Sequence, residues 1–239
     1  MFHYNFLGKE VDFVGHNSAR AQIDLSSKID MPVKTCTQVH GDKIVVVTNS
    51  DQKIDEVQAD AIITTLSNVI IGVKTADCVP ILIAGSKTIA AIHAGRKGAL
   101  LNISAKVINS LIEDFEENIS DLKVLIGPHL RFENHLIFDN EANKFPPRYC
   151  DYSPIGEHAV NNKLIVSKYL EDNNLTNKSM NSWQSARFDF SAFVIDQLLA
   201  CSLNPNQIQD CSIDSFDNQK FHSYRRDYPN HGLNFGYIW

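Results

Sequence analysis

The chain has 239 residues, enough for one large domain or two small ones, with 44% hydrophobic and 21% charged residues. The formal net charge of −6 disfavours nucleic acid and anionic membranes as partners, because both attract basic surfaces. No apolar run approaches the roughly 20 residues that span a bilayer, and the five scattered cysteines do not suggest a disulfide framework. We therefore expect a cytoplasmic protein with reduced thiols.

Short strands dominate the pattern of the first hundred residues. Aromatic and apolar residues alternate within residues 1–16, which favours edge strands, whereas residues 19–31 show no clear pattern. Residues 33–39 alternate like a half-buried strand, and residues 43–48 are rich in β-branched side chains. Further apolar runs predict strands at residues 61–65, 69–73, 79–84 and 88–93.

The period of the pattern changes after residue 93. Apolar residues recur at spacings of three and four over residues 98–117, which predicts one amphipathic helix with its N-terminus near His93. A second helical stripe covers residues 190–201. Strands are predicted at 122–126 and 132–138, residues 144–154 look irregular, and 163–170 fit either a strand or a helix. With no internal repeat or long linker, we predict one mixed α/β domain over residues 1–239.

Two of the apolar runs bring chemically reactive side chains together. Cys78 stands at the head of one run and His93 at the tail of the next. Between them, residues 85–87 (Gly-Ser-Lys) are typical of a turn, because glycine relaxes the backbone and its two neighbours are polar. Two strands joined by a tight turn form a hairpin. Cys78 and His93 are therefore expected to meet at its open end.

A third residue of the same kind, His40, lies at another break between apolar runs. Taken singly, a cysteine or histidine here is more simply explained as a small buried hydrophobe or as a hydrogen-bonded strand-end residue. All three lie at strand ends flanked by Gly, Asp or Pro, where functional side chains are usually displayed. Three protein ligands with an open fourth position are the usual arrangement of catalytic zinc. The pattern therefore favours a metal site at His40, Cys78 and His93.

Charged residues near these ligands are candidates for proton transfer or anion binding. Asp77 is either a loop cap or a group that orients a ligand or moves a proton. Arg96 and Lys97, at the start of the predicted helix, either bind an anion or are solvated charges. Arg225 and Arg226 lie among aromatic residues and form either a substrate clamp or a structural ion pair.

The other histidines give weaker signals. His129 follows a Gly-Pro pair, and although it could line a cleft, we expect it at the surface. His135 has no partner that the sequence identifies.

Five motifs occur in a fixed order along the chain. They are Gln-Val-His-Gly at 38–41, Thr-Ala-Asp-Cys-Val-Pro at 75–80, His-Ala-Gly at 93–95, Ile-Gly-Pro at 126–128 and the tail segment at 221–227. In this order they resemble the multicopper-oxidase-like laccase-domain family. That family is also called the YfiH family, and it includes purine nucleoside phosphorylases and peptidoglycan-editing factors. The resemblance covers about residue 30 to the C-terminus, although Arg96 and Lys97 stand where the family usually has Trp-Arg.

This resemblance implies a single α/β/β/α layered domain with mixed sheets and a site at one end of them. It implies a metal, zinc or alternatively copper, held by the residues at His40, Cys78 and His93. The implied substrates are phosphate and purine nucleosides: adenosine, inosine, guanosine or methylthioadenosine for phosphorolysis, and adenosine for deamination. The residues that would bind substrate and phosphate are Lys97, Arg225 and Arg226.

Several hypotheses remain open at this point. In the leading one, a zinc-dependent nucleoside enzyme, deamination would use a metal-activated water with Asp77 as proton carrier. Alternatively, Cys78 is a nucleophile activated by His93, as in cysteine hydrolases. Copper oxidation of phenols is disfavoured because the chain has no His-x-His pair. The two other hypotheses are peptidoglycan precursor editing and a binding protein without catalytic activity. The oligomeric state is not predicted.

Overall fold

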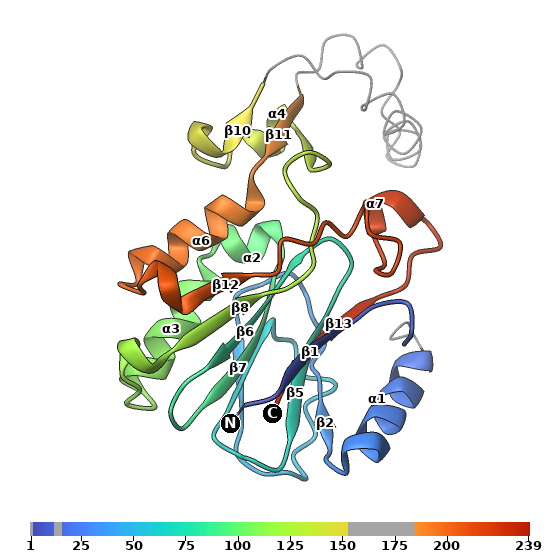
Figure 1. Ribbon diagram of the computed structural model, residues 1–239, viewed down its shortest axis with the longest axis vertical. Helices are drawn as coiled ribbons and strands as arrows, with labels where there is room; N and C mark the ends of the chain where they lie inside the picture. The colour runs from blue at the N-terminus through green and yellow to red at the C-terminus, as the bar shows by residue number, and fades with distance from the viewer. Residues whose placement is uncertain (1, 12–15, 153–184) are drawn as a thin grey trace.

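A six-stranded mixed sheet forms the centre of the computed structural model, which describes residues 2–11, 16–152 and 185–239 (Figure 1). Its strands, in spatial order, are β12 (Ile208–Asp210), β8 (Lys123–Ile126), β6 (Val79–Ala84), β7 (Ile89–Ala94), β4 (Ala61–Thr64) and β3 (Ile44–Val47). The outer pairs β12–β8 and β3–β4 are parallel, and the inner pairs are antiparallel. Strands β4, β6 and β7 are buried along their whole length, which explains their largely apolar sequences.

A second sheet packs face to face against the first. Its strands, in spatial order, are β1 (Tyr4–Leu7), β13 (Asn234–Ile238), β5 (Ile70–Thr75) and β2 (Val33–Lys34). Between the two sheets, Ile62 and Leu82 of the first share a buried cluster with Ile71 and Val73 of the second. This cluster forms the inner core of the molecule.

Helices cover the outer face of each sheet. On the six-stranded sheet lie α3 (Ile103–Glu113) and α6 (Phe190–Ala200), and on the four-stranded sheet lies α1 (His16–Ile29), through its buried Ala21 and Leu25. The predicted α/β/β/α layering is therefore confirmed. None of the described helices is both long enough and apolar enough to cross a membrane.

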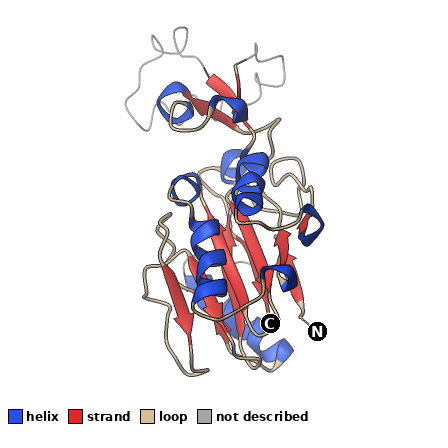
Figure 2. Ribbon diagram, turned by 90° about the vertical axis from the view of Figure 1, so that its left-hand side faces the viewer, coloured by secondary structure: helices blue, strands red, loops and turns tan. Residues whose placement is uncertain are grey.

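Smaller elements complete the described part of the chain. A three-stranded antiparallel sheet of β10 (Cys150–Asp151), β11 (Ser185–Phe188) and β9 (Leu136–Phe138) stands apart at the upper end of the molecule (Figure 2). The short helices are α2 (Arg96–Leu100), α4 (Asp139–Ala142) and α7 (Tyr224–Asp227), with 3-10 turns at Ile119–Asp121, Pro147–Tyr149 and Pro205–Gln207.

The predicted hairpin is confirmed as β6–β7. Its register pairs Val79 with Ala94 and Pro80 with His93, so Cys78 immediately precedes the strand that lies beside His93. The turn is closed by a hydrogen bond from the Gly85 N–H to the Thr88 carbonyl (2.8 Å). The open end of the hairpin therefore brings the thiol and the imidazole together.

Three sequence expectations differ from the structure. The single helix predicted over residues 98–117 is two helices, α2 and α3, because Asn102 adopts a left-handed backbone (φ 63°) that a continuous helix cannot contain. Residues 19–31, left unassigned, belong mostly to α1. The strand predicted over 33–39 is paired only at Val33 and Lys34, followed by an isolated bridge between Thr37 and Gln58. At its end the backbone N–H groups of Val39 and His40 bond to the Asp60 side chain instead of a neighbouring strand.

The remaining strand and helix predictions hold within a few residues, with β9 shorter than expected. The segments predicted at 43–48, 61–65, 69–73, 122–126, 132–138 and 190–201 correspond to β3, β4, β5, β8, β9 and α6. The edge strand expected near the N-terminus is β1. Residues 163–170, which fitted either a strand or a helix, lie outside the described residues.

Candidate metal centre and cleft

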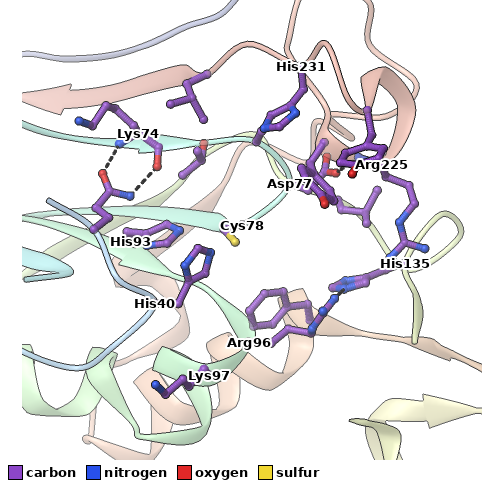
Figure 3. A pocket seen from close by; sticks show the side chains of 18 of the residues that line it. His40, Lys74, Asp77, Cys78, His93, Arg96, Lys97, His135, Arg225 and His231 are labelled. Atoms are coloured by element: carbon purple, nitrogen blue, oxygen red, sulfur yellow. Dashed lines mark hydrogen bonds between the residues drawn. The ribbon is translucent and has the colours of Figure 1, made fainter. Parts of the chain in front are cut away.

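Three side chains from separate segments converge at one end of the two sheets. His40 comes from the turn before β3, Cys78 from the residue before β6, and His93 from β7 (Figure 3). Their ligand atoms all lie within 4.8 Å of one another. His93 is 3% exposed, Cys78 is half-buried, and His40 is exposed. The three residues therefore form a group of the size and chemistry that holds a metal ion.

Asp60, a buried residue at the start of β4, organises this group. Its Oδ1 lies 2.8 Å from His93 Nδ1 and accepts the His40 N–H (2.9 Å). Its Oδ2 accepts the N–H groups of Gly41 (2.7 Å) and Val39 (3.2 Å). One carboxylate thus fixes both the loop that carries His40 and the ring of His93. His40 itself has a left-handed backbone (φ 57°), which this set of hydrogen bonds supports.

A glycine lets α2 begin directly against His40 and Cys78. A Cβ added at Gly95 would lie 2.7 Å from His40 Cδ2 and 3.4 Å from Cys78 Sγ. The first of these distances is too short for any side chain, so only glycine fits here. The predicted placement of a helix start beside His93 is confirmed, although this helix has only five residues.

The donor atoms fit a metal that prefers sulfur and imidazole nitrogen. An ionised carboxylate only accepts hydrogen bonds, so Asp60 fixes the proton of His93 on Nδ1 and leaves the Nε2 lone pair for a metal. One thiolate and two imidazoles are ligands typical of zinc and of copper. Within the described residues, this is the one group of three or more such side chains close enough to hold an ion.

The same proximity changes the acidity of the ligands. Burial opposes ionisation of the Cys78 thiol, but the charge on His93 and hydrogen bonds from both imidazoles outweigh it and lower its pKa to about 6. Burial would likewise lower the pKa of His93, yet the Cys78 thiolate and Asp60 raise it to about 9. Without a metal, Cys78 and His93 therefore form a thiolate–imidazolium pair at neutral pH.

A cleft of about 850 Å3 opens above the three residues. Besides them, it is lined by residues of α2, α7, β9 and the tail, including Lys97 and Arg225, and by Asp77 from the loop between β5 and β6. Its volume is in the range of pockets that bind small organic molecules.

Comparison with known proteins identifies the family. The family model described as "Multi-copper polyphenol oxidoreductase laccase" matches residues 7–239. The chain belongs to this laccase family. A purine nucleoside phosphorylase of Rickettsia conorii is 31% identical over 195 residues, covering 80% of this chain and 69% of the relative. A purine nucleoside phosphorylase of Aquifex aeolicus is 41% identical over 95 residues, which cover 40% of this chain and 43% of the relative, less than half of each.

Solved structures share the fold at lower sequence identity. The crystal structure of the Bacillus licheniformis hypothetical protein YfiH superposes with a TM-score of 0.74 at 20% identity, covering 95% of this chain and 84% of that chain. YlmD from Geobacillus stearothermophilus gives a TM-score of 0.75 at 20% identity, covering 95% and 83%. These likenesses agree with the mixed α/β architecture described above.

Asp77 occupies the cleft of this laccase-family chain with both carboxylate oxygens engaged. Oδ1 accepts the hydroxyl of Ser215 (2.6 Å), and Oδ2 accepts the backbone N–H of Arg225 (2.6 Å). Asp77 also has a left-handed backbone (φ 82°). Of the two interpretations given above, these contacts favour the loop cap, because the side chain ties the Cys78 loop to the tail.

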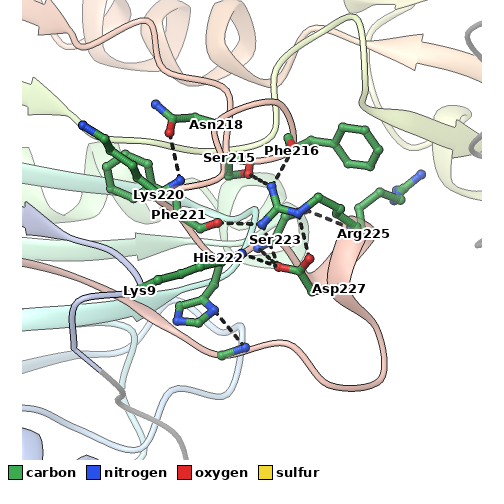
Figure 4. A network of polar contacts seen from close by, with 12 residues as sticks. Lys9, Ser215, Phe216, Asn218, Lys220, Phe221, His222, Ser223, Arg225 and Asp227 are labelled. Atoms are coloured by element: carbon green, nitrogen blue, oxygen red, sulfur yellow. Dashed lines mark hydrogen bonds and ion pairs between the residues drawn. The ribbon is translucent and has the colours of Figure 1, made fainter.

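The predicted basic residues lie in two different places. Lys97 is exposed and lines the cleft with Arg225, whose Nη2 donates to the Leu136 carbonyl (2.9 Å). Arg226 is not among the residues that line the cleft, and its guanidinium donates to the carbonyls of Ser215 and Phe216 and pairs with Asp227. Figure 4 shows this network around Asp227. For Arg226 the contacts favour the structural ion pair.

Two histidines were misjudged or missed from the sequence. His129, expected at the surface, is fully buried, with Nδ1 2.8 Å from the Gly127 carbonyl and Nε2 2.7 Å from Ser191 Oγ. His135 is 3% exposed and lines the cleft. Asp60 was missed as well, and its only signal is a charged residue at the head of the apolar run 61–64.

Proposed function

We propose that this protein is a zinc-dependent purine nucleoside enzyme that cleaves nucleosides by phosphorolysis. The observation that carries the proposal is the group of His40, Cys78 and His93, which lines a cleft and in which Asp60 holds the two histidines. The names of the relatives from Rickettsia conorii and Aquifex aeolicus support the choice of substrate.

The three ligands would hold zinc, with the Nε2 atom of His93 directed by Asp60. The ion, when bound, would supply a positive charge that polarises an oxygen of the substrate or of water. Copper is the alternative metal, because the same donors bind it. Multi-copper oxidation needs several copper sites, whereas the described residues offer one group of ligands.

An aromatic cluster among the residues that line the cleft would receive the purine ring. Tyr224, Tyr228 and His231 all line the cleft. The ring of Tyr224 lies 5.1 Å from that of Tyr228 and 4.7 Å from that of His231. A flat heterocycle gains both area burial and stacking on such a surface. These rings would compensate for the tryptophan that relatives usually carry where this chain has Arg96.

The test is turnover of defined nucleosides by zinc-loaded protein. Adenosine, inosine and methylthioadenosine are incubated with and without phosphate, and free base, ribose 1-phosphate and deaminated nucleoside are separated by chromatography. The proposal predicts free base that forms only with phosphate. Deamination of adenosine would appear as inosine without phosphate. Protein with one zinc per chain that consumes none of these nucleosides would contradict the proposal.

The lowered pKa of Cys78 supports a second candidate, a hydrolase in which the thiolate is the nucleophile and His93 its proton partner. The two candidates differ in what zinc does to the thiol. In the first, zinc blocks alkylation of Cys78 and is required for turnover. In the second, metal-free protein is the active form, and alkylation by iodoacetamide abolishes its activity.

A further inference from the structure

One side of the cleft carries a cluster of charged and polar side chains that is separate from the metal ligands. Figure 3 shows Arg96, His135 and Arg225 on this side, with His40 and His93 on the other. The three residues come from α2, from the turn before β9 and from α7, far apart in the sequence. The fold therefore brings two guanidinium groups to one imidazole within the cleft.

Direct contacts connect Arg96 to His135 and to one carboxylate, and Arg225 is held in the cleft by contacts of its own. Nη1 of Arg96 lies 3.5 Å from Nε2 of His135, and Nη2 of Arg96 lies 2.9 Å from Glu141 Oε2. Arg225 is held by its backbone N–H on Asp77 and by its Nη2 on the Leu136 carbonyl. Both members of the Arg96–Glu141 pair are about one-third exposed (36% and 37%), so water and ligands reach this ion pair.

His135 is uncharged in this setting. Burial lowers its pKa well below 6.5, and the positive charges of Arg96 and Arg225 lower it further. A guanidinium only donates hydrogen bonds, so Nε2 accepts from Arg96 and the proton resides on Nδ1. The buried Nδ1 has no hydrogen-bond partner among the described residues. A neutral ring lets two guanidinium groups approach it without adding a third positive charge.

The charge balance of the cleft points to an anion. Among the described residues that line it, Lys74, Arg96, Lys97 and Arg225 are cationic, and Asp77 and Glu141 are acidic. This excess of positive charge occurs in a chain whose net charge is −6. A concave surface of one sign concentrates ligands of the opposite sign.

We propose that Arg96, His135 and Arg225 form a subsite for a phosphate group, and that Glu141 occupies the guanidinium of Arg96 until the phosphate replaces it. The planar donors of arginine match the oxygens of phosphate. Replacing the Glu141 carboxylate by a phosphate should cost little free energy, because a partly exposed ion pair contributes little to stability. The subsite adds a position for phosphate to the proposed function, and its biological role rests on that function.

Two sources could supply the phosphate group. Inorganic phosphate would be the second substrate of phosphorolysis, and the 5′-phosphate of a nucleotide would be part of the first substrate. The chemistry of the subsite is the same in both cases, so the experiment must tell them apart.

The test measures equilibrium binding to zinc-loaded protein by calorimetry, with inorganic phosphate, adenosine and AMP as probes. Arg96→Gln should weaken phosphate binding by roughly tenfold, since it removes a charge-assisted contact. Glu141→Gln should strengthen binding several-fold, because it removes the competing carboxylate. Arg148→Gln is the matched control, since Arg148 is 70% exposed on a surface ion pair with Asp196 and does not line the cleft. Zinc content is measured for every variant.

The probes separate the two sources. If inorganic phosphate is the ligand, it binds equally well beside saturating adenosine, and AMP binds no more tightly than adenosine. If a nucleotide is the ligand, AMP binds more tightly than adenosine, displaces phosphate, and loses this advantage in Arg96→Gln. Either outcome supports the subsite. Unchanged phosphate and AMP affinities in both Arg96→Gln and Glu141→Gln, or no measurable phosphate or AMP binding to the unaltered protein, overturn it.

Failure of the subsite and failure of the proposed function give different results. If turnover depends on phosphate but Arg96→Gln has an unchanged KM for phosphate, the subsite is refuted and the proposed phosphorylase activity is not. Phosphate binding that depends on Arg96, in a protein that consumes no nucleoside, would refute the phosphorylase and leave the subsite standing.

Discussion

Asp60 is the residue on which the geometry of the candidate metal centre depends most. Its carboxylate bonds to the ring of His93 and to three backbone N–H groups of the loop that carries His40. Burial alone would raise its pKa, but the hydrogen bonds from His93 and Gly41 lower it below the usual value, so the group is ionised. Two of the three candidate ligands are therefore positioned by a residue outside the group itself.

Replacing this carboxylate should weaken metal binding without removing a ligand. In Asp60→Asn, we expect zinc affinity to fall by roughly 10- to 100-fold, because the amide neither fixes the His93 proton on Nδ1 nor polarises the ring. Chelator competition measures the affinity. Asp114→Asn, at an exposed aspartate that follows the last residue of α3, is the control and should bind zinc normally. An unchanged affinity in Asp60→Asn would mean that the His93–Asp60 contact has no role in the site.

Arg226 has a structural role, although its neighbour Arg225 lines the cleft. It shares a basic pair with Arg225, yet its guanidinium bonds to the carbonyls of Ser215, Phe216 and Phe221. We expect Arg226→Gln to lower the free energy of unfolding by about 2–3 kcal/mol, since buried carbonyls lose charge-assisted donors. Urea denaturation measures this change. Phosphate affinity of the folded variant should be unaltered, and a selective loss of phosphate binding would instead place Arg226 in the binding site.

At the scale of elements, the hairpin of β6 and β7 depends on a distant carboxylate at its closed end. Glu117, 4% exposed, accepts the backbone N–H groups of Ser86, Lys87 and Thr88 and the hydroxyls of Ser86 and Thr88, at distances from 2.7 to 2.9 Å. Burial would raise its pKa, but these hydrogen bonds lower it to about 2. The turn is thus fixed independently of the candidate metal ligands at the open end.

This contact should make stability depend on pH in a defined direction. Because the folded pKa of Glu117 is lower than its ordinary value of 4.5, its contribution is complete above pH 4.5 and is lost as the pH falls towards 2. Glu117→Gln should lower the free energy of unfolding by about 2–3 kcal/mol at pH 7. The variant should also lose less stability than the unaltered protein as the pH falls from 4.5 to 2. Glu116→Gln, whose side chain is 88% exposed, serves as the control. Equal pH profiles for the unaltered protein and Glu117→Gln would contradict this account.

Local sequence predicted the elements whose structure is determined by nearby residues. The hairpin is one of these, because two apolar runs and a Gly-Ser-Lys turn are enough to predict its strands, although the sequence pattern does not show that Glu117 holds the turn. The break between α2 and α3 was missed because apolar periodicity continues across Asn102, whose left-handed backbone the pattern does not show. Asp60 was missed for a different reason. Its partners lie 19 to 33 residues away, and the pairing of β4 with β7 on one side and with β3 on the other brings them to it.

The whole molecule explains why the site forms where it does. Two sheets packed face to face, with helices outside them, place the ends of several strands at one edge. His40, Cys78 and His93 meet there, and the tail closes the cleft with α7. The strand-end pattern and the family motifs both predicted the three candidate ligands, whereas His135 and Glu141 become neighbours of Arg96 only through the packing of β9 and α4 against the rest.

Zinc should stabilise the folded chain, because the unfolded chain cannot keep the three ligands together. Excess zinc should raise the melting temperature of metal-free protein, and a strong chelator should reverse the rise. At zinc concentrations 100 times the dissociation constant, the expected gain is about 2.7 kcal/mol. Cys78→Ser should show a much smaller response, measured by scanning calorimetry, whereas Cys201→Ser, away from the site, should respond like the unaltered protein. If both variants respond equally, zinc stabilises the protein by binding somewhere other than this site.

The central claim is that His40, Cys78 and His93 hold one zinc ion. Elemental analysis of the purified protein, beside Cys78→Ser and His93→Ala, tests it most directly, with Cys201→Ser as the control. The account predicts about one zinc per chain in the unaltered protein and the control, and a large loss in both ligand variants. Zinc that persists undiminished in Cys78→Ser and His93→Ala, or a purified protein that takes up no zinc when it is supplied, would contradict it.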